Sequence, residues 1–239
     1  MNPQTTKEGL ELERRTMGEY DFNREYNAQF IDDQFTYFPS TLVLGCVDDY
    51  TLNPEPQPGQ KLKGNFYVGV DFGKHADHSA IAITQEQPDH TLKLVYLRQF
   101  PLETPYTTVI ATLQLLNSIY MFLRGYVDQT GVGEAPYEEV RKFAPCIRGI
   151  TFTAKTKQEI LGNLLLTMER KDVTIPRGPK QLLTQLTQQR CEPTQQGTYS
   201  FTHPSGTHDD LMWAFALSVY AYPGPTEWMN TVIGIRRPE

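Results

Sequence analysis

Hydrophobic and polar positions divide the chain into a polar first quarter and an alternating strand and helix pattern after residue 60. Residues 65–71 form an apolar run that is typical of a buried strand. Residues 79–85 and 91–100 are also strand-like, and the turn segment EQPDH lies between them. Because consecutive strands with short connections usually pair with each other, we expect an antiparallel meander here.

The rest of the chain alternates between apolar residues at helical spacing and short extended runs. The pattern predicts helices over 105–123, 135–144, 155–170, 179–190 and 208–222. Strands or extended segments are expected over 125–130, 148–153, 172–176 and 198–202. A meander that leads into parallel crossovers predicts an α/β fold, with a mixed five-stranded or slightly extended sheet and helices on both faces.

Residues 1–60 are expected to form an N-terminal arm, because they are polar, acidic and rich in aromatic residues. Phe22, Tyr26 and Phe30 have the spacing of one helix face, which favours packing against a neighbour. The segment NPEPQPGQ, residues 53–60, interrupts regular structure with three prolines and a glycine. We therefore predict three regions: an arm or linker over 1–60, the α/β domain over 61–225 and a C-terminal tail over 226–239.

Composition excludes several classes of protein. With 39% hydrophobic residues the chain can bury a core, and no apolar run approaches the roughly 18 residues that span a bilayer. The N-terminus has no apolar signal segment, and three scattered cysteines match neither a zinc site nor a disulfide framework, which indicates a reducing compartment. A net charge of −6 argues against a protein that coats nucleic acid, although residues 141–190 hold ten basic and three acidic side chains. That segment could attract phosphate or be an ordinary solvated surface.

Carboxylates stand where the predicted strands end. Asp71 ends the first strand in VGVDFGK, and Asp128 ends the fourth in GYVDQTG. If those strands are parallel neighbours, the two side chains emerge side by side, and the last helix could bring Asp209 and Asp210 to the same place. Each acid alone could be a turn former or a helix-start residue. Together they would repel, and divalent Mg²⁺ or Mn²⁺ is the usual compensation.

Four segments resemble the nuclease domain of the large terminase subunit of tailed viruses, within the ribonuclease H-like superfamily. They are FYVGVDFGKHADHSAIAI, GYVDQTGVG, FTAKTKQEILGNLLLTMER and the most specific block, GTHDDLMWAFALSVYA. The segment ERRTMGEYDFNREYNAQFIDDQFTYFP resembles the connection between the terminase ATPase and its nuclease. The resemblance covers nearly all of residues 8–222.

The resemblance implies a metal-dependent endonuclease that cuts concatemeric viral DNA during packaging, with two Mg²⁺ or Mn²⁺ ions. Asp71 and Asp128 match the two strand acids of the family motif, although some relatives carry Glu in place of Asp128. The third acid is Asp209 or Asp210; we favour Asp210 as a metal ligand and Asp209 as a second or supporting ligand. His208 is expected to support these ligands or contact phosphate, and an ordinary helix-start role stays open.

The implied partners are double-stranded DNA, a packaging ATPase domain, the portal and the small terminase subunit, in the cytoplasm of the host cell and without a membrane. No GxxxxGK[ST] phosphate loop occurs in the chain, so the motor is absent from it. The arm favours an excised nuclease domain over a free-standing relative. Lys74, Arg148, Lys155 and Lys157 are our candidates for contacts with the DNA backbone.

Three alternatives remain. A junction resolvase or transposase of the same superfamily would share the metal chemistry but not the arm. An actin-like ATPase would need a second similar domain. A non-catalytic module that docks on a motor or portal would fold normally but cleave nothing. We expect weak sequence preference, because no recognition helix, zinc finger or aromatic stacking platform is evident in the sequence.

Overall fold

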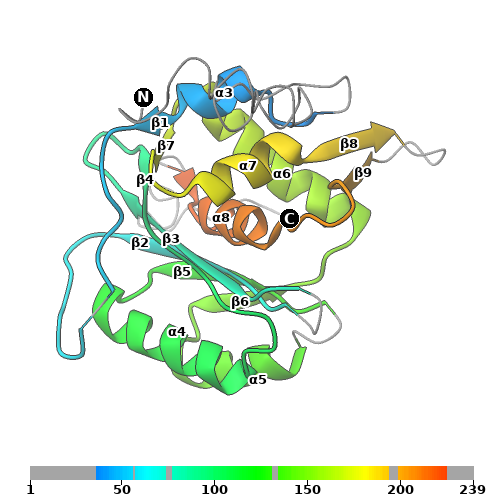
Figure 1. Cartoon of the computed structure of the whole chain (residues 1–239). Coiled ribbons are helices and arrows are strands. Elements are labelled where there is room, and N and C mark those ends of the chain that lie inside the picture. The colour runs from blue at the N-terminus through cyan, green and yellow to red at the C-terminus, as the bar shows by residue number, and fades with distance from the viewer. Residues whose placement is uncertain (1–35, 56, 74–76, 131–133, 194–198, 225–239) are drawn as a thin grey trace, which may run out of the picture.

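The computed structural model describes residues 36–55, 57–73, 77–130, 134–193 and 199–224. Within this part of the chain, seven strands form one sheet in the order β1-β7-β4-β3-β2-β5-β6 (Figure 1). The strands are β1 (Val47–Asp48), β2 (Phe66–Asp71), β3 (Ala80–Glu86), β4 (Leu92–Gln99), β5 (Arg124–Asp128), β6 (Ile147–Ile150) and β7 (Val173–Pro176). The helices are α3 (Ser40–Gly45), α4 (Tyr106–Tyr120), α5 (Glu134–Phe143), α6 (Ala154–Glu169), α7 (Lys180–Gln188) and α8 (Asp210–Tyr220).

The sheet confirms the predicted α/β class and the antiparallel meander. β2 pairs with β3 and β3 with β4 in antiparallel register, while β5 and β6 follow β2 in parallel register. The sheet was predicted to have five strands or slightly more, and it has seven, because β7 and β1 add parallel strands beside β4. β7 occupies the extended segment predicted over 172–176, whereas β1 has two residues, too few to show a period.

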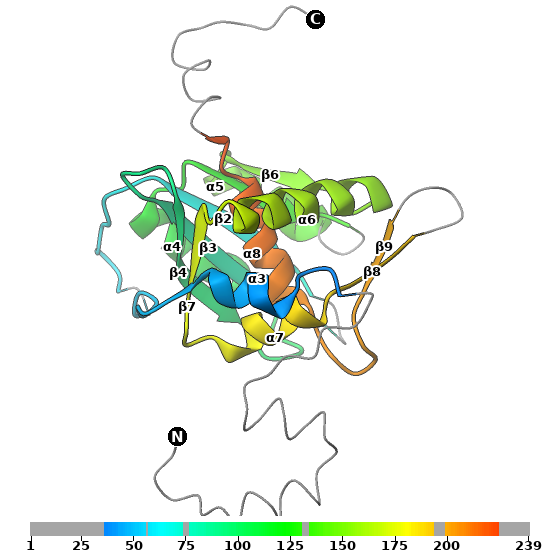
Figure 2. The same ribbon diagram turned by 90° about the horizontal axis from the view of Figure 1, so that it is seen from above.

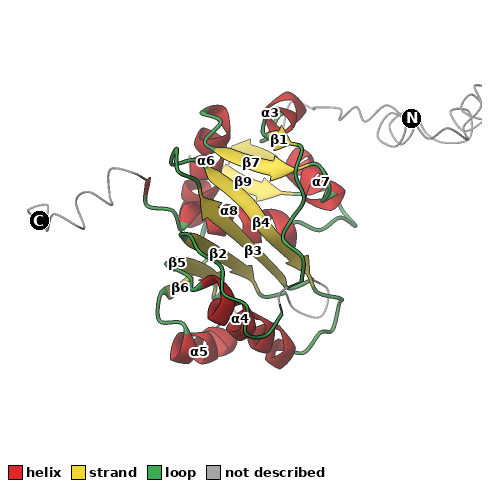
Figure 3. Ribbon diagram, turned by 90° about the vertical axis from the view of Figure 1, so that its left-hand side faces the viewer, coloured by secondary structure: helices red, strands yellow, loops and turns green. Residues whose placement is uncertain are grey.

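Two apolar layers cover the sheet. The α4 and α5 helices pack on one face against side chains such as Val68, Ile81 and Ile83. The α8 helix, with α3, α6 and α7 around it, packs on the other face against Tyr67 and Ala82. Figures 1 and 3 show α4 and α5 together on one side of the sheet and the remaining helices on the opposite side.

A separate antiparallel hairpin joins α7 to α8. It consists of β8 (Arg190–Pro193) and β9 (Tyr199–Thr202), and only β9 was expected from the sequence. Figure 2 shows these two strands extending away from the body of the molecule. The prediction ran the preceding helix to residue 190, but α7 ends at Gln188 and the chain is already extended at Gln189.

The close approach of α8 to the sheet depends on Gly69 in the middle of β2. A Cβ atom at this position would lie 2.0 Å from the carbonyl oxygen of Ala214 and 2.4 Å from the amide nitrogen of Ser218. Such distances are far inside van der Waals contact, so any larger residue would push the helix away. The glycine therefore fixes how closely α8, and the acids at its start, lie to the end of β2.

The later part of the predicted arm packs on the domain. Phe38 and Val43 have no exposed surface, and Cys46 is buried with them in the α8-side core. The Tyr50 hydroxyl lies 3.0 Å from the carbonyl oxygen of Leu94 and 2.9 Å from that of Thr174. Residues 36–53 thus contribute to the folded body, while the Phe22, Tyr26 and Phe30 stripe and the 226–239 tail lie outside the described residues. In the described part of the chain, no helix has the length and apolarity required to cross a membrane.

Candidate active site

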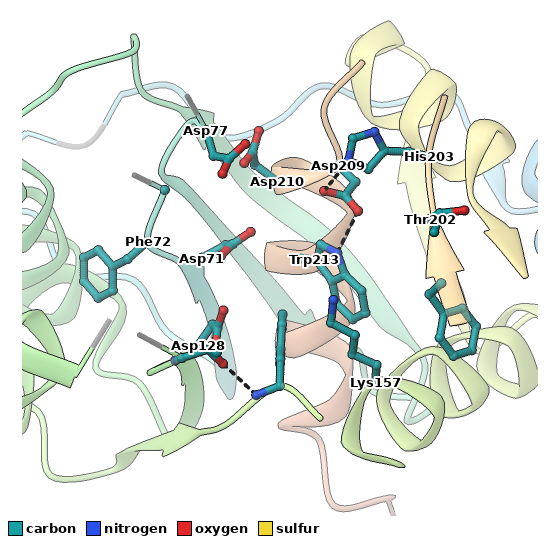
Figure 4. Close-up of a pocket in the computed structure, with 14 residues that line it drawn as sticks. Asp71, Phe72, Asp77, Asp128, Lys157, Thr202, His203, Asp209, Asp210 and Trp213 are labelled. Carbon is teal, nitrogen blue, oxygen red and sulfur yellow. Dashed lines mark hydrogen bonds and ion pairs between the residues drawn. The ribbon is translucent and has the colours of Figure 1, made fainter. Parts of the chain in front are cut away.

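Strand pairing brings Asp71 and Asp128 together. Val70 of β2 is in register with Val127 of the parallel strand β5, so the next residue of each strand is an aspartate at the same sheet edge. The α8 helix begins there, with Asp209 as its N-cap and Asp210 as its first residue. These four carboxylates and Asp77 from the β2–β3 loop line one cavity of about 540 Å³, which we call the acid cavity. Figure 4 shows the five side chains around it.

Asp71 lies close enough to the other acids for their negative charges to act on its carboxyl group. Burial raises the pKa of Asp71 well above its ordinary value, and the negative charges of Asp128, Asp210, Asp209 and Asp77 raise it further. The side chain points into the cavity between the two strand ends and the start of α8 (Figure 4). The folded chain therefore concentrates negative charge that a bound cation would neutralise.

Asp128 is oriented by the turn that follows its strand. The backbone N–H of Thr130 donates to Asp128 Oδ1 over 2.8 Å, and the Thr130 hydroxyl donates to the same oxygen. That hydroxyl also accepts the N–H of Phe152 over 2.7 Å, which ties the β5 turn to the segment after β6. Burial raises the pKa of Asp128, whereas the Thr130 hydrogen bonds and the charge of Lys157 oppose the rise.

Asp209 is held by groups on its own helix and on the hairpin. The indole N–H of Trp213, one turn further along α8, donates to Asp209 Oδ2 over 2.9 Å. His203, which follows β9, places Nε2 3.7 Å from Asp209 Oδ1. These contacts keep the Asp209 carboxylate on the side of the cavity that faces the hairpin (Figure 4).

Asp210 is buried and has polar neighbours on the opposite side. Gln99 Nε2 donates to Asp210 Oδ2 over 3.4 Å, and His208 Nδ1 lies 4.0 Å from the same oxygen. Burial raises the pKa of Asp210 and the charge of Asp209 adds to this, whereas His208 and His78 lower it. The adjacent acids at the start of α8 thus point to different surroundings, which sequence alone left open.

The donor set suits Mg²⁺ or Mn²⁺, since these ions prefer oxygen ligands and the cavity offers carboxylates from several elements. Among the described residues that line the cavity, Lys157 is the only lysine or arginine. In the described part of the chain, no three or more Asp, Glu, His or Cys side chains already have the arrangement of a metal site. The acids face one cavity without forming a closed ligand set, and a cation would relieve the carboxylate repulsion that adds to burial in raising the pKa of Asp71 and Asp210.

The basic residues predicted to contact DNA lie in different places. Lys157 lines the acid cavity, with Nζ 5.2 Å from the Trp213 ring centre and 5.5 Å from that of Phe152. Arg148 is exposed on β6, and Lys155 is exposed with Nζ 3.9 Å from Glu159; neither lines the cavity. Lys74 lies outside the described residues. His208 contacts Asp210 from outside the cavity rather than lining it.

Several cavity residues were not predicted from the sequence. Asp77 could have been found from the sequence, since it is an acid in the short loop that follows Asp71. No sequence pattern pointed to Thr130 or His203. The aromatic side chains of Phe152, Phe201 and Trp213 line one wall of the cavity, although the sequence showed no aromatic platform. They come from segments far apart in the chain, so only the folded structure brings them together.

Comparison with known proteins gives a consistent result. The family model described as terminase RNaseH-like domain matches residues 68–221. The large terminase subunit of Thermus virus P23-45 is 27% identical over 227 residues, which cover 89% of this chain and 44% of that protein. The chain thus spans less than half the length of this curated relative.

Solved structures share the fold. The large terminase nuclease from thermophilic phage G20c has a TM-score of 0.62 at 22% identity, over 79% of this chain and 100% of that one. The same nuclease has been solved with bound magnesium, again with a TM-score of 0.62 and 22% identity, over 79% of this chain and 98% of that one. The HK97 bacteriophage large terminase has a TM-score of 0.59 at 13% identity, over 92% of this chain and 51% of that one.

Proposed function

The chain belongs to the terminase RNaseH-like domain family, and we propose that it is a metal-dependent endonuclease that hydrolyses phosphodiester bonds of double-stranded DNA. The observation that carries this proposal is the cavity at the end of β2 and β5, where carboxylates from both strands and from α8 converge. The magnesium-bound structure of a related nuclease supports a divalent cation as the cofactor. Membership of this family favours a terminase nuclease over a junction resolvase, a transposase or an actin-like ATPase.

The position of each residue in the cavity indicates its proposed role in binding the metal ions, orienting a ligand or binding phosphate. Asp71 lies between the other acids and would share both cations, Asp128 would hold one, and Asp210 with Asp209 would hold the other. Two Mg²⁺ or Mn²⁺ ions bound there would activate a water molecule and stabilise the leaving oxygen. Thr130 and Trp213 fix the orientation of Asp128 and Asp209. Lys157 offers a positive charge to the phosphate at the same cavity.

The proposed reaction is a single displacement at phosphorus. The water oxygen forms a bond to phosphorus while the bond to O3′ breaks, which inverts phosphorus and leaves a 3′-hydroxyl and a 5′-phosphate. The water gives up one proton to solvent, and the leaving O3′ takes one proton from solvent to become the 3′-hydroxyl. Because contacts with phosphate carry little sequence information, we expect weak sequence preference.

The biological setting is part of the same proposal. We infer that the domain cuts concatemeric viral DNA during packaging, in the cytoplasm of the host cell. A packaging ATPase domain, the portal and the small terminase subunit would be its partners. The support is the match to large terminase subunits, of which this chain covers 44%.

Plasmid digestion tests the proposal. The parent chain, Asp71→Ala and Asp89→Ala are incubated with supercoiled plasmid in Mg²⁺, Mn²⁺, Ca²⁺ or EDTA. Asp89 is the control, because it is an exposed acid in the β3–β4 turn at the far end of the sheet. We expect the parent to nick and linearise the plasmid in Mn²⁺ or Mg²⁺ and to leave it intact in EDTA. The cleavage rate should fall by at least roughly 100-fold in Asp71→Ala and stay unchanged in Asp89→Ala. A folded parent that cleaves under no metal would instead favour a non-catalytic docking module.

A further inference from the structure

A second pocket of about 400 Å³ adjoins the acid cavity on the other side of Asp210. One wall comes from α7, with Lys180, Gln181, Thr184 and Gln188; His78 and His208 lie among the remaining lining residues. We call this pocket, defined by these six residues, the α7 groove. Among the described residues that line it there is no aspartate or glutamate, in contrast to the five aspartates of the acid cavity.

The α7 groove lies one side chain away from the acid cavity. Gln99 and His208 line the groove, and both approach Asp210 Oδ2, at 3.4 Å and 4.0 Å. Asp210 in turn lines the acid cavity. The two pockets also share the β2–β3 loop, since Asp77 lines the acid cavity and His78 lines the groove.

The α7 helix is fixed to the start of α8. The side chain of Gln185 is buried, and its Oε1 accepts the backbone N–H of Met212 over 3.0 Å. That N–H belongs to the first turn of α8, which has no partner within its own helix. The position of α7 is thus tied to the helix that carries Asp209 and Asp210.

This attachment leaves a polar stripe of α7 facing the groove. Lys180, Thr184 and Gln188 are four residues apart, and Gln181 lies beside them, so their side chains share one helix face. Leu182, Leu183 and Leu186 point the other way into the core. Among the described residues, the side chains of Lys180, Gln181 and Gln188 have no hydrogen-bond or ion-pair partner.

The chemistry of the α7 groove fits phosphate. An ammonium group, two amides and a hydroxyl are donors that commonly contact the DNA backbone. The absence of carboxylates from the described lining removes the repulsion that makes the acid cavity dependent on cations. We propose that the α7 groove binds the sugar-phosphate backbone of DNA next to the phosphate held at the acid cavity. This inference rests on the proposed function, and it adds a DNA-binding surface that the basic residues picked from the sequence did not include.

Binding without cleavage tests the inference directly. Anisotropy of a dye-labelled 30-base-pair duplex is measured in EDTA at several salt concentrations, with the full chain. We expect Lys180→Ala to weaken binding about tenfold and to reduce the salt slope by about one. Gln181→Glu places a negative charge in the groove on a side chain of the same size as glutamine. It should weaken DNA binding at least as much as Lys180→Ala does. Both residues are exposed, and thermal melts verify folding.

Matched controls make the same chemical changes elsewhere. Lys61→Ala removes an exposed lysine from the loop before β2, at the end of that strand opposite Asp71. Gln114→Glu changes an exposed residue on α4, across the sheet from α7. We expect each control to stay within about twofold of the parent.

The outcomes separate the two proposals. Weaker binding in both groove variants but not in the controls supports the α7 groove, even if the parent cleaves no plasmid. Equal binding by parent and groove variants, with metal-dependent cleavage intact, overturns the groove and leaves the nuclease. Equal losses in groove variants and controls also overturn it, because the effect would then be a general one of charge. A parent that binds no duplex overturns the groove as well.

Discussion

Asp71 is the residue on which the charges of the acid cavity act together. Its pKa is raised well above the ordinary value, first by burial and then by four neighbouring carboxylates. A carboxyl group whose folded-state pKa exceeds its unfolded value destabilises the fold when it is ionised. The chain therefore gives up stability at this position, which is expected where binding rather than folding determines the residue.

We predict that Asp71→Asn stabilises the metal-free domain. At pH 8 in EDTA the free energy of unfolding should be higher in the variant than in the parent, because the amide carries no charge to be buried among the other carboxylates. The difference in free energy of unfolding should shrink as the pH falls below the raised pKa of the folded parent, because its Asp71 carboxyl then becomes protonated. It should be smallest near pH 3.8, the ordinary pKa of the unfolded chain. Urea titrations of both proteins at pH 8, 7, 6 and 5 measure it, and a constant difference would contradict the electrostatic explanation.

Some of these residues could be predicted one by one, and others could not. Asp71 and Asp128 stand where predicted strands end, so a correct topology was enough to bring them together. The roles of Asp209 and Asp210 could not be separated, because their neighbours Trp213, His203 and Gln99 are brought to them only by folding. Side-chain partners that are distant in sequence leave no local pattern.

At the scale of elements, the distance between α8 and β2 determines whether the acids meet. Asp71 ends β2, Asp210 begins α8 and Asp209 is the N-cap of α8, and Gly69 allows the strand and the helix to approach each other. The helix is apolar all round and almost entirely buried, which is why the sequence showed it clearly. The position of Gly69 near Asp71 indicated that a backbone or substrate approaches closely there, but the sequence did not identify α8 as that backbone.

We predict that Gly69→Ala destabilises the domain by about 1–3 kcal/mol, because the new methyl group would meet backbone atoms that cannot rotate away. Plasmid cleavage should fall with it, since α8 would move with its acids. Gly162→Ala is the control: it lies inside α6, where the nearest group is the Tyr37 hydroxyl at 3.9 Å. It should be neutral or stabilising by up to about 1 kcal/mol. Equal effects in both variants would exclude close packing as the cause.

Element prediction succeeded where a segment was long enough to show a period. The meander, α4, α6 and α8 were predicted close to their observed bounds. β1 and β8 were not predicted, although the four-residue strands β6, β7 and β9 were. β1 has only two residues, and β8 begins at Arg190, where the sequence pattern placed the end of a helix; both are defined by the strand they pair with. The width of the sheet therefore had to come from the structure.

At the scale of the whole molecule, the boundary of the domain is set by packing rather than by composition. The prolines of residues 53–60 predicted a linker, and the charge of residues 1–60 predicted an arm. Yet Phe38, Val43 and Cys46 lie in the same core as α6 and α8. A segment can be polar on average and still supply several core side chains, which an average over sixty residues does not show.

This packing makes a prediction about the unfolding of the whole domain. Phe38→Ala should lower the free energy of unfolding by about 3–5 kcal/mol, because the ring is completely buried against the α8-side core. Leu44→Ala is the matched control, since that side chain is 46% exposed on the neighbouring helix α3 and should cost no more than about 1 kcal/mol. Urea unfolding of the full chain, followed by circular dichroism, measures both. If residues 36–48 were an independent arm, Phe38→Ala would leave the main transition unchanged; a shift of the entire transition, with one midpoint, means that this segment folds as part of the α/β domain.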